Sequence, residues 1–178
     1  MIRRANLGVP KVKLHAGDIE IAIAKHLNPR INLIVPNISW GLWFNHEIDL
    51  LVVTQNKYAW EIEIKISVSD LKADLKKEHH HESAKIKRFY FAVPETLKDK
   101  ALELIPKNAG LFTVEEDDTC WVHLVKAPTV NINARKFNDE EMQRLYELAA
   151  MRLWSLKETI YRIQREKPKK KPNKMSEV

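Results

Sequence analysis

Residues 60–67 read Trp-Glu-Ile-Glu-Ile-Lys-Ile-Ser, and this alternation of charged and apolar side chains decides the fold. Successive side chains of a strand point to opposite faces, so the two glutamates and Lys65 share one face and the isoleucines share the other. Residues 46–53, His-Glu-Ile-Asp-Leu-Leu-Val-Val, form a second predicted strand, in which Asp49 interrupts an apolar run. The two runs predict neighbouring strands that carry acidic side chains.

Asp49, Glu63 and Lys65 together have the chemistry of phosphodiester hydrolysis. Two carboxylates on adjacent strands repel each other, which raises one pKa unless a cation lies between them. Mg²⁺ or Mn²⁺ suits oxygen ligands, and such an ion activates a water and offsets negative charge on the phosphorane-like transition state. Lys65 can position that water and stabilise the developing charge. Glu20, on a predicted helix, adds a carboxylate, whereas Glu61 lies one pleat further back and is left out of the predicted site.

The same pattern also fits a strand without catalytic function, because any half-exposed strand alternates charged and apolar residues. Three features favour a site. The strand of Glu63 is predicted to be central, Asp49 interrupts the preceding strand at a compatible position, and a helix with a glutamate precedes both. The nuclease interpretation therefore depends on this combination rather than on Glu-x-Lys alone.

Length and composition fit one domain and exclude several classes of protein. The 178 residues can bury a core of normal size, and the four glycines form no GxGxxG or GxxxxGK[ST] motif. A single cysteine, Cys120, excludes an internal disulfide framework and suits a reducing cytoplasm. No apolar run reaches the roughly 18 residues of a membrane helix, and no secretory signal is recognisable. We therefore expect a cytoplasmic protein without a membrane span.

The net charge of +6 is concentrated at the two ends of the chain. Residues 1–13 carry four basic and no acidic side chains, and residues 164–178 carry six basic against two acidic ones. Basic extensions attract phosphate backbones without reading sequence, although lysine-rich tails also serve solubility alone. We expect a basic arm at residues 1–13, one domain at residues 14–165 and a disordered Lys-rich tail at residues 166–178.

The remaining periodicities predict alternating helices and strands. Helices are expected over residues 16–27, 69–81, 94–104 and 138–165, and further strands over residues 31–35, 49–54, 85–93, 109–114 and 120–125. The apolar strand at 85–93 is typical of the centre of a parallel sheet. This order predicts an α/β fold with three layers, a mixed central sheet flanked by helices, and a long C-terminal helix.

Single residues predict several local features. Ser69 is the expected N-cap of the second helix, and Pro36 is expected to stop the first strand. Asn56 is expected to take a positive φ in the turn at residues 55–57. Cys120 is expected in the core of the last strand rather than as a nucleophile.

Residues 63–76, Glu-Ile-Lys-Ile-Ser-Val-Ser-Asp-Leu-Lys-Ala-Asp-Leu-Lys, resemble the EIK, S-x-x-D and D-x-K elements of the MmcB-like DNA-repair family, within the PD-(D/E)XK nuclease superfamily. Residues 89–94 and 105–111 resemble its FAVP and LP-x-x-AGL segments, and the similarity spans about residues 48–128. The resemblance implies a restriction-endonuclease-like fold and a setting in DNA repair or DNA processing.

The resemblance also implies roles for the candidate residues. Asp49 and Glu63 would hold Mg²⁺ or Mn²⁺, the backbone carbonyl of Ile64 would be a further ligand, and Lys65 would hold the attacking water. Two aspartates of the family pattern, one helical turn apart, are expected to support the site: Asp70 and Asp74.

The chain departs from the family pattern at two places. Lys77 stands where the family has Trp, and the three histidines at residues 79–81 have no counterpart. Three consecutive histidines cannot all face one point of a helix, so we expect a solvated helix end there rather than a transition-metal site. His46, beside the Asp49 strand, is either a packed or surface residue or a helper at the site.

We expect DNA as the partner of this domain. Its phosphates would be held by basic side chains near the site and in the tail: Lys85, Lys87, Arg88, Lys169, Lys170 and Lys171. Trp40, Trp43 and Phe44 form either a small core under a loop or a stacking platform for bases.

Two alternatives to a nuclease stay open, a DNA-binding module of the same fold without catalysis and an interaction protein. The interaction protein would form a homodimer through the C-terminal helix. Asn138 or Asp139 is the expected N-cap of that helix.

Overall fold

The computed structural model describes residues 13–39, 42, 44, 46–74 and 83–166. Several predictions lie outside these residues: most of the basic arm, the tryptophans at 40 and 43, the histidines at 79–81 and the Lys-rich tail from residue 167. The described part includes both strands with the candidate carboxylates and all of the predicted sheet.

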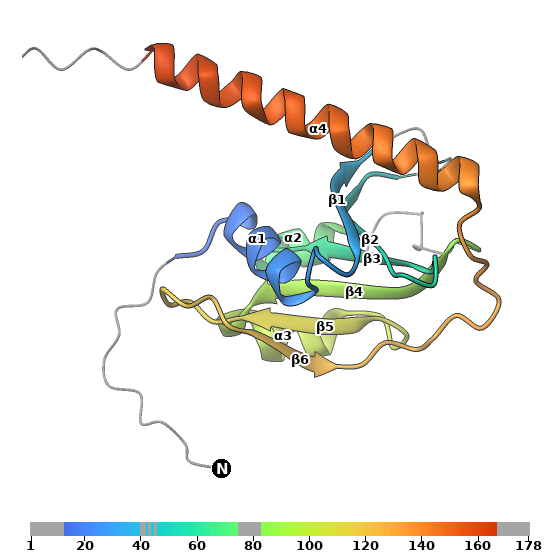
Figure 1. Ribbon diagram of the computed structural model, residues 1–178. Helices are drawn as coiled ribbons and strands as arrows, with labels where there is room; N and C mark the ends of the chain where they lie inside the picture. The colour runs from blue at the N-terminus through green and yellow to red at the C-terminus, as the bar shows by residue number, and fades with distance from the viewer. Residues whose placement is uncertain (1–12, 40–41, 43, 45, 75–82, 167–178) are drawn as a thin grey trace, which may run out of the picture.

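Six strands form one mixed sheet (Figure 1): β1 (Leu33–Ile38), β2 (Ile48–Val53), β3 (Ala59–Ile64), β4 (Ile86–Pro94), β5 (Gly110–Val114) and β6 (Val122–Lys126). They lie side by side in the order of the sequence. β3, β4 and β5 run parallel, and the other neighbouring pairs are antiparallel. β4 therefore lies inside the sheet between parallel neighbours, as its apolar sequence predicts.

Helices cover both faces of the sheet (Figure 1). One face packs against α1 (Ala16–His26), and the other packs against α2 (Val68–Asp74), α3 (Lys98–Leu104) and the first half of α4 (Asp139–Glu166). A short 3₁₀ turn, η1 (Glu95–Leu97), leads into α3. The predicted α/β fold with three layers, a mixed sheet and a long C-terminal helix is confirmed.

The alternation along β3 divides its side chains between two cores. Ile62 and Ile64 lie in the core under α1, and Ala59 lies in the core on the opposite face. Glu61 and Glu63 share the face of Ala59, yet they are only 0% and 2% exposed. The charged face of this strand is therefore buried, which is costly for carboxylates and sets the chemistry of the region.

Two features of the strands correct the sequence prediction. β1 continues through Pro36 because it is an edge strand beside β2, where the missing N–H of a proline can face away from the ladder. Cys120 lies in the turn before β6, with φ of 47°, and not in the strand. The side chain of Asp117 causes this, because it accepts hydrogen bonds from the N–H groups of Thr119 and Cys120 and prolongs the turn.

The helix cap and the hairpin turn also differ from the prediction. Ser67, not Ser69, caps α2, since its Oγ accepts a 3.1 Å hydrogen bond from the N–H of Asp70. The positive φ of the turn belongs to Lys57, at 63°, and not to Asn56. A three-residue hairpin loop places its left-handed residue last, which explains the shift.

α4 begins with the predicted cap and ends beyond the domain. Asn138 Oδ1 accepts a 2.8 Å hydrogen bond from the N–H of Glu141, and Glu141 Oε2 accepts one of 3.0 Å from the N–H of Asn138. Leu145 and Leu148 are buried and pack the first half of the helix against the sheet, while the second half extends past the sheet (Figure 1).

None of the helices in the described part combines the length and apolar character that a membrane span requires.

Gly110 lies where β5 passes the ring of Tyr90. A Cβ added at Gly110 would lie 2.5 Å from Cδ1 of Tyr90 and 3.0 Å from the carbonyl oxygen of Lys126. The Tyr90 ring is stacked on Phe112, with 4.7 Å between ring centroids, so it cannot move away freely. We expect Gly110→Ala to lower the free energy of unfolding in urea by about 2 kcal/mol.

Gly17→Ala is the matched control for this prediction. A Cβ at Gly17, in the first turn of α1, meets nothing within 4 Å. The control is expected to leave stability unchanged or to raise it by up to about 0.5 kcal/mol, because alanine favours the helix. An equal loss of stability in both variants would contradict the crowding at Gly110.

Candidate functional site

The register of β2 and β3 brings Asp49 and Glu63 together. Leu50 pairs with Ile62, so the next pair of residues along the ladder is Asp49 and Glu63. Asp49 Oδ2 accepts a 2.8 Å hydrogen bond from the backbone N–H of Ile64, which fixes the carboxylate at the edge of β3. The two predicted metal ligands are therefore neighbours on adjacent strands.

Lys65 lies directly after β3 and bonds to Glu63. Its Nζ donates a 2.8 Å hydrogen bond to Glu63 Oε2, and the two side chains are only 8% and 3% exposed. The backbone N–H of Lys65 donates to the carbonyl oxygen of Ala92 at 3.0 Å, which continues the pairing of β3 with β4. This backbone pairing positions the lysine that the sequence predicts to hold the attacking water.

The environment of Glu63 favours its protonated form. Burial raises the pKa of Glu63 to about 7, and the charges of Asp49 and Glu61 act in the same direction against the opposing effect of Lys65. Its Oε1 is buried and has no hydrogen-bond partner in the part of the chain that the structure describes. A buried carboxylate oxygen without a partner is unfavourable unless a proton or a cation accompanies it.

α1 contributes the third predicted carboxylate. Ile19 and Ile23 are fully buried against the sheet and fix the helix, and Glu20 lies between them in sequence on a half-buried position. Burial raises the pKa of Glu20, and the charge of Asp49 raises it further. The carboxylate of Glu20 is therefore within electrostatic reach of Asp49. Its helix, α1, covers the face of the sheet opposite to the one that carries Glu63.

Asp49, Glu63 and Glu20 offer the type of donor that a hard divalent cation takes, but among the described residues they do not form a group whose ligand atoms all lie within 4.8 Å of one another. Carboxylate oxygens are the protein ligands that Mg²⁺ and Mn²⁺ prefer. Glu63 Oε1 is the oxygen best placed to accept such an ion, because Lys65 already occupies Oε2. The choice of metal, and the carbonyl of Ile64 as a further ligand, stay predictions.

Two further side chains lie beside these carboxylates: Glu61, which the sequence prediction omits, and His46, which it treats only as a possible helper. Glu61 is fully buried, and its Oε1 lies 2.7 Å from Nε2 of His46. His46 lies just before β2, with its ring 6.5 Å from that of Phe44. The alternation along β3 already places Glu61 on the face of Glu63, and this signal could have identified it.

The two supporting aspartates lie on α2. The side chain of Asp70 is exposed in the first turn of the helix. Asp74 is the last residue of α2 and the last one described before the gap at 75–82. The supporting role of both residues stays a prediction.

Lys85, one of the predicted DNA ligands, is engaged inside the protein. Its Nζ donates a 2.7 Å hydrogen bond to the carbonyl oxygen of Leu42 and lies 2.8 Å from Oε1 of Glu141. The side chain is only 15% exposed. These contacts give Lys85 a part in anchoring α4, and its contact with DNA stays a prediction.

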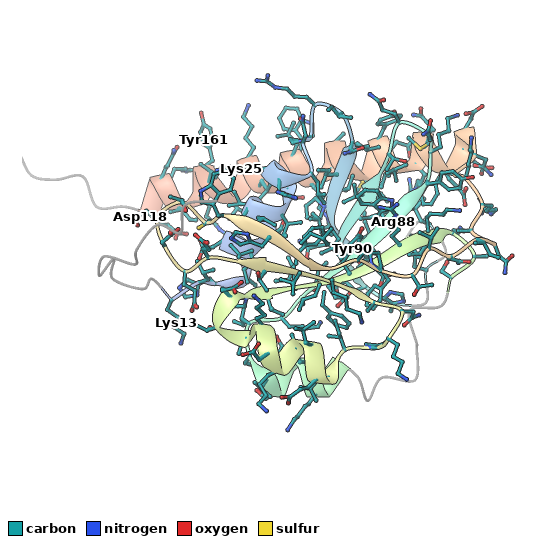
Figure 2. The ribbon with its side chains drawn as sticks, turned by 90° about the horizontal axis from the view of Figure 1, so that it is seen from below. Lys13, Lys25, Arg88, Tyr90, Asp118 and Tyr161 are labelled. Carbon is teal, nitrogen blue, oxygen red and sulfur yellow. The ribbon has the colours of Figure 1, made fainter. Side chains whose placement is uncertain are left out.

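Lys87 and Arg88 of β4 lie over aromatic rings. Lys87 Nζ is 4.6 Å from the ring centroid of Tyr58, and the guanidinium carbon of Arg88 is 5.0 Å from that of Trp60. Figure 2 shows Arg88 next to Tyr90. The ring centroid of Tyr90 lies 5.9 Å from that of Trp60. Both cations are held at defined places, whereas the predicted lysines at 169–171 lie outside the described residues.

Comparison with solved structures supports the fold. The chain is similar to the SPO1766 protein of unknown function from Silicibacter pomeroyi, at 22% sequence identity and a TM-score of 0.61. The similarity covers 82% of this chain and 94% of the other. At this level of identity the similarity concerns the fold alone.

Comparison with protein families identifies the chain. No curated protein matches it. A family model described as DNA repair protein MmcB-like matches residues 40–160, which is more than half of the chain and includes β2 to β6, their helices and most of α4. The protein therefore belongs to the MmcB-like family of DNA repair proteins.

Proposed function

We propose that this member of a DNA repair family is a metal-dependent DNA nuclease of the PD-(D/E)XK type. One observation carries the proposal: buried Glu63 lies beside Asp49, is bonded to Lys65 at 2.8 Å, and keeps a buried oxygen without a partner in the described residues. A strand buried for stability alone would carry apolar residues here, because buried carboxylates are costly. The family supplies DNA as the substrate class.

The proposed roles follow from the positions of the side chains. Asp49 and Glu63, with Glu20 nearby, would hold Mg²⁺ or Mn²⁺, which when bound supplies a water of lowered pKa and neutralises charge on the phosphate. Lys65 places its ammonium group beside Glu63, where it can orient the attacking water and stabilise negative charge on the phosphate oxygens. The protein thereby keeps a water and the scissile phosphate next to one another.

Cleavage assays with an Asp49 variant test the proposal. The full chain and Asp49→Asn are incubated with single-stranded, duplex, flap and junction DNA in Mg²⁺ or in Mn²⁺. Metal-dependent cleavage by the wild type is expected, and its loss in Asp49→Asn. Asp99→Asn is the control, because Asp99 is exposed on α3 and is expected to leave cleavage unchanged.

Other outcomes distinguish the alternatives. Equal cleavage by wild type and Asp49→Asn would show that a contaminant cuts the DNA. Binding of DNA by the wild type without cleavage of any form would favour a binding module. A stable dimer that binds no nucleic acid at low salt would favour an interaction protein, for which α4 offers a row of exposed apolar side chains: Leu153, Leu156, Ile160 and Ile163.

A further inference from the structure

Two buried carboxylates and one mostly buried imidazole converge on the side of β3 that carries Glu63. His46, Glu61 and Glu63 each offer one ligand atom, and these atoms lie within 4.8 Å of one another. The side chains of His46 and Glu61 are 9% and 0% exposed, and that of Glu63 is 3% exposed. Such a group is shielded from water, unlike a cluster of acidic residues on a surface.

The set has an oxygen free to coordinate an ion. Lys65 bonds to Oε2 of Glu63 at 2.8 Å, and Oε1 of the same carboxylate is buried without a hydrogen-bond partner among the described residues. A buried polar atom of this kind is rare in folded proteins and calls for an explanation by an ion or a water. The imidazole of His46 and the carboxylate of Glu61, hydrogen-bonded to each other at 2.7 Å, supply two further ligand atoms of the kind that a transition-metal ion takes.

We propose that His46, Glu61 and Glu63 bind one divalent transition-metal ion of the Zn²⁺ and Co²⁺ class. One imidazole and two carboxylates form a ligand set that Zn²⁺ accepts, with metal–ligand bonds of about 2.0–2.2 Å. Two ligands of one ion lie at most about 4.4 Å apart at these bond lengths. Side-chain shifts of a few tenths of an ångström would therefore close the site.

This ion differs from the one in the proposed nuclease site. The imidazole of His46 disfavours Mg²⁺, which takes oxygen ligands, and favours the first-row transition metals. Asp49 and Glu20 take no part in the set, so the inference goes beyond the proposed function and does not depend on it. Glu63 is the residue that the two sites have in common.

A bound ion would also link the segment that precedes β2 to the neighbouring strand β3. His46 lies in the segment that leads into β2, whereas Glu61 and Glu63 lie in the neighbouring strand. Coordination would cross-link this segment to the centre of the sheet, next to the carboxylate of Asp49. The ion would thereby help to position the segment that enters the candidate nuclease site.

Titration with metal alone tests the inference. The experiment uses the full untagged chain, stripped with EDTA and then dialysed, in a His79→Asn, His80→Asn, His81→Asn background, because three adjacent histidines also bind transition metals. Co²⁺ is followed by its visible absorption, and Zn²⁺ by calorimetry. One strong site is expected, with a Kd that rises about 100-fold in Glu61→Gln and in His46→Gln.

Two control variants separate this site from the others. His123 and Glu115 form a similar pair of 2.9 Å on the surface, with side chains 51% and 40% exposed, so His123→Gln is expected to leave the Kd unchanged. Asp49→Asn is also expected to retain the Co²⁺ and Zn²⁺ site, since Asp49 supplies none of its ligands. Loss of cleavage with retained Zn²⁺ binding in Asp49→Asn would separate the two sites.

Thermal unfolding with and without Zn²⁺ guards against variants that fail to fold. Zn²⁺ is expected to raise the Tm of the wild type and of His123→Gln, and to leave the Tm of a folded Glu61→Gln unchanged. Absence of a strong Co²⁺ or Zn²⁺ site in the chain that carries only the three histidine substitutions would overturn the inference. Equal affinity in the wild type, His46→Gln and Glu61→Gln would overturn it as well.

Discussion

Replacement of Glu63 by glutamine is expected to stabilise the metal-free protein at pH 8 by about 3 kcal/mol and to remove metal-dependent DNA cleavage. The stabilisation follows from the environment of the carboxylate. Burial, assisted by the charges of Asp49 and Glu61, raises the pKa of Glu63 from 4.5 to about 7. The folded protein therefore holds the proton of Glu63 more tightly than the unfolded chain does.

The sign of the pH dependence is set by this raised pKa. Below pH 4.5 the group is protonated in both states and does not affect stability. Between pH 4.5 and about 7 the unfolded chain releases the proton first, so the folded state loses stability as the pH rises. A shift of this size corresponds to about 3 kcal/mol above pH 7, at 1.36 kcal/mol per pKa unit.

Urea unfolding in EDTA at pH 5 and pH 8 measures the effect. The free energy of unfolding of Glu63→Gln is expected to exceed that of the wild type slightly at pH 5 and by a large amount at pH 8. Glu103→Gln is the matched control, since Glu103 forms an exposed pair with Lys100 that contributes little at either pH. A Glu63→Gln protein less stable than the wild type at pH 8 would contradict the unfavourable burial of this charge.

The same substitution removes a proposed metal ligand. An amide oxygen carries no charge, so the Mg²⁺ site is weakened and cleavage is expected to fall at least about 10³-fold, which corresponds to about 4 kcal/mol of activation free energy. A more stable but inactive variant is the signature of a functional site that costs stability. A buried carboxylate retained for packing would show no such opposition between stability and activity.

Period-two alternation accounts for much of what the sequence predicts at this site. It identifies the face that Glu63 and Lys65 share, and the neighbouring apolar run places Asp49 on the adjacent strand. The alternation does not say whether that face is solvated, because the layer that covers it comes from residues far away in the chain. The sequence prediction therefore omits Glu61, although this residue is fully buried.

Local signals in the sequence are less reliable where two residues compete for one role. Ser67 and Ser69 are both suitable N-caps, and which of them caps α2 depends on the residue at which β3 ends. Pro36 would end a central strand, but it is accepted at the edge of this sheet. These positions depend on the arrangement of neighbouring elements, which single-residue preferences do not contain.

Glu141 is the clearest case of a residue that only the fold explains. In the sequence it stands in the first turn of a helix, where an acidic residue is ordinary. In the structure it is 3% exposed and receives Nη1 and Nη2 of Arg135 at 2.6 Å each. Lys85 Nζ, from a residue 56 positions earlier in the chain, lies 2.8 Å from its Oε1. The carboxylate thus ties the start of α4 to the chain just before β4.

Glu141→Gln is expected to lower the free energy of unfolding at pH 7 by about 3 kcal/mol. Loss of one partner of a buried ion pair leaves the other charge uncompensated and costs about 3–5 kcal/mol, and the lower end applies because Arg135 is partly open to solvent. The hydrogen bonds from Arg135, together with those from Lys85 and the N–H of Asn138, lower the pKa of Glu141 to about 2.

The pH dependence of this second variant has the opposite sign to that of Glu63→Gln. A lowered pKa means that the ionised carboxylate stabilises the fold fully above pH 4.5 and progressively less as the pH falls toward about 2. The difference in free energy of unfolding between the wild type and Glu141→Gln is therefore expected to become smaller as the pH falls over that range. Glu147→Gln is the control, since its pair with Arg144 is largely exposed and contributes little to stability. A gap that stays constant down to pH 2 would show that side-chain shape, and not the charge of Glu141, anchors α4.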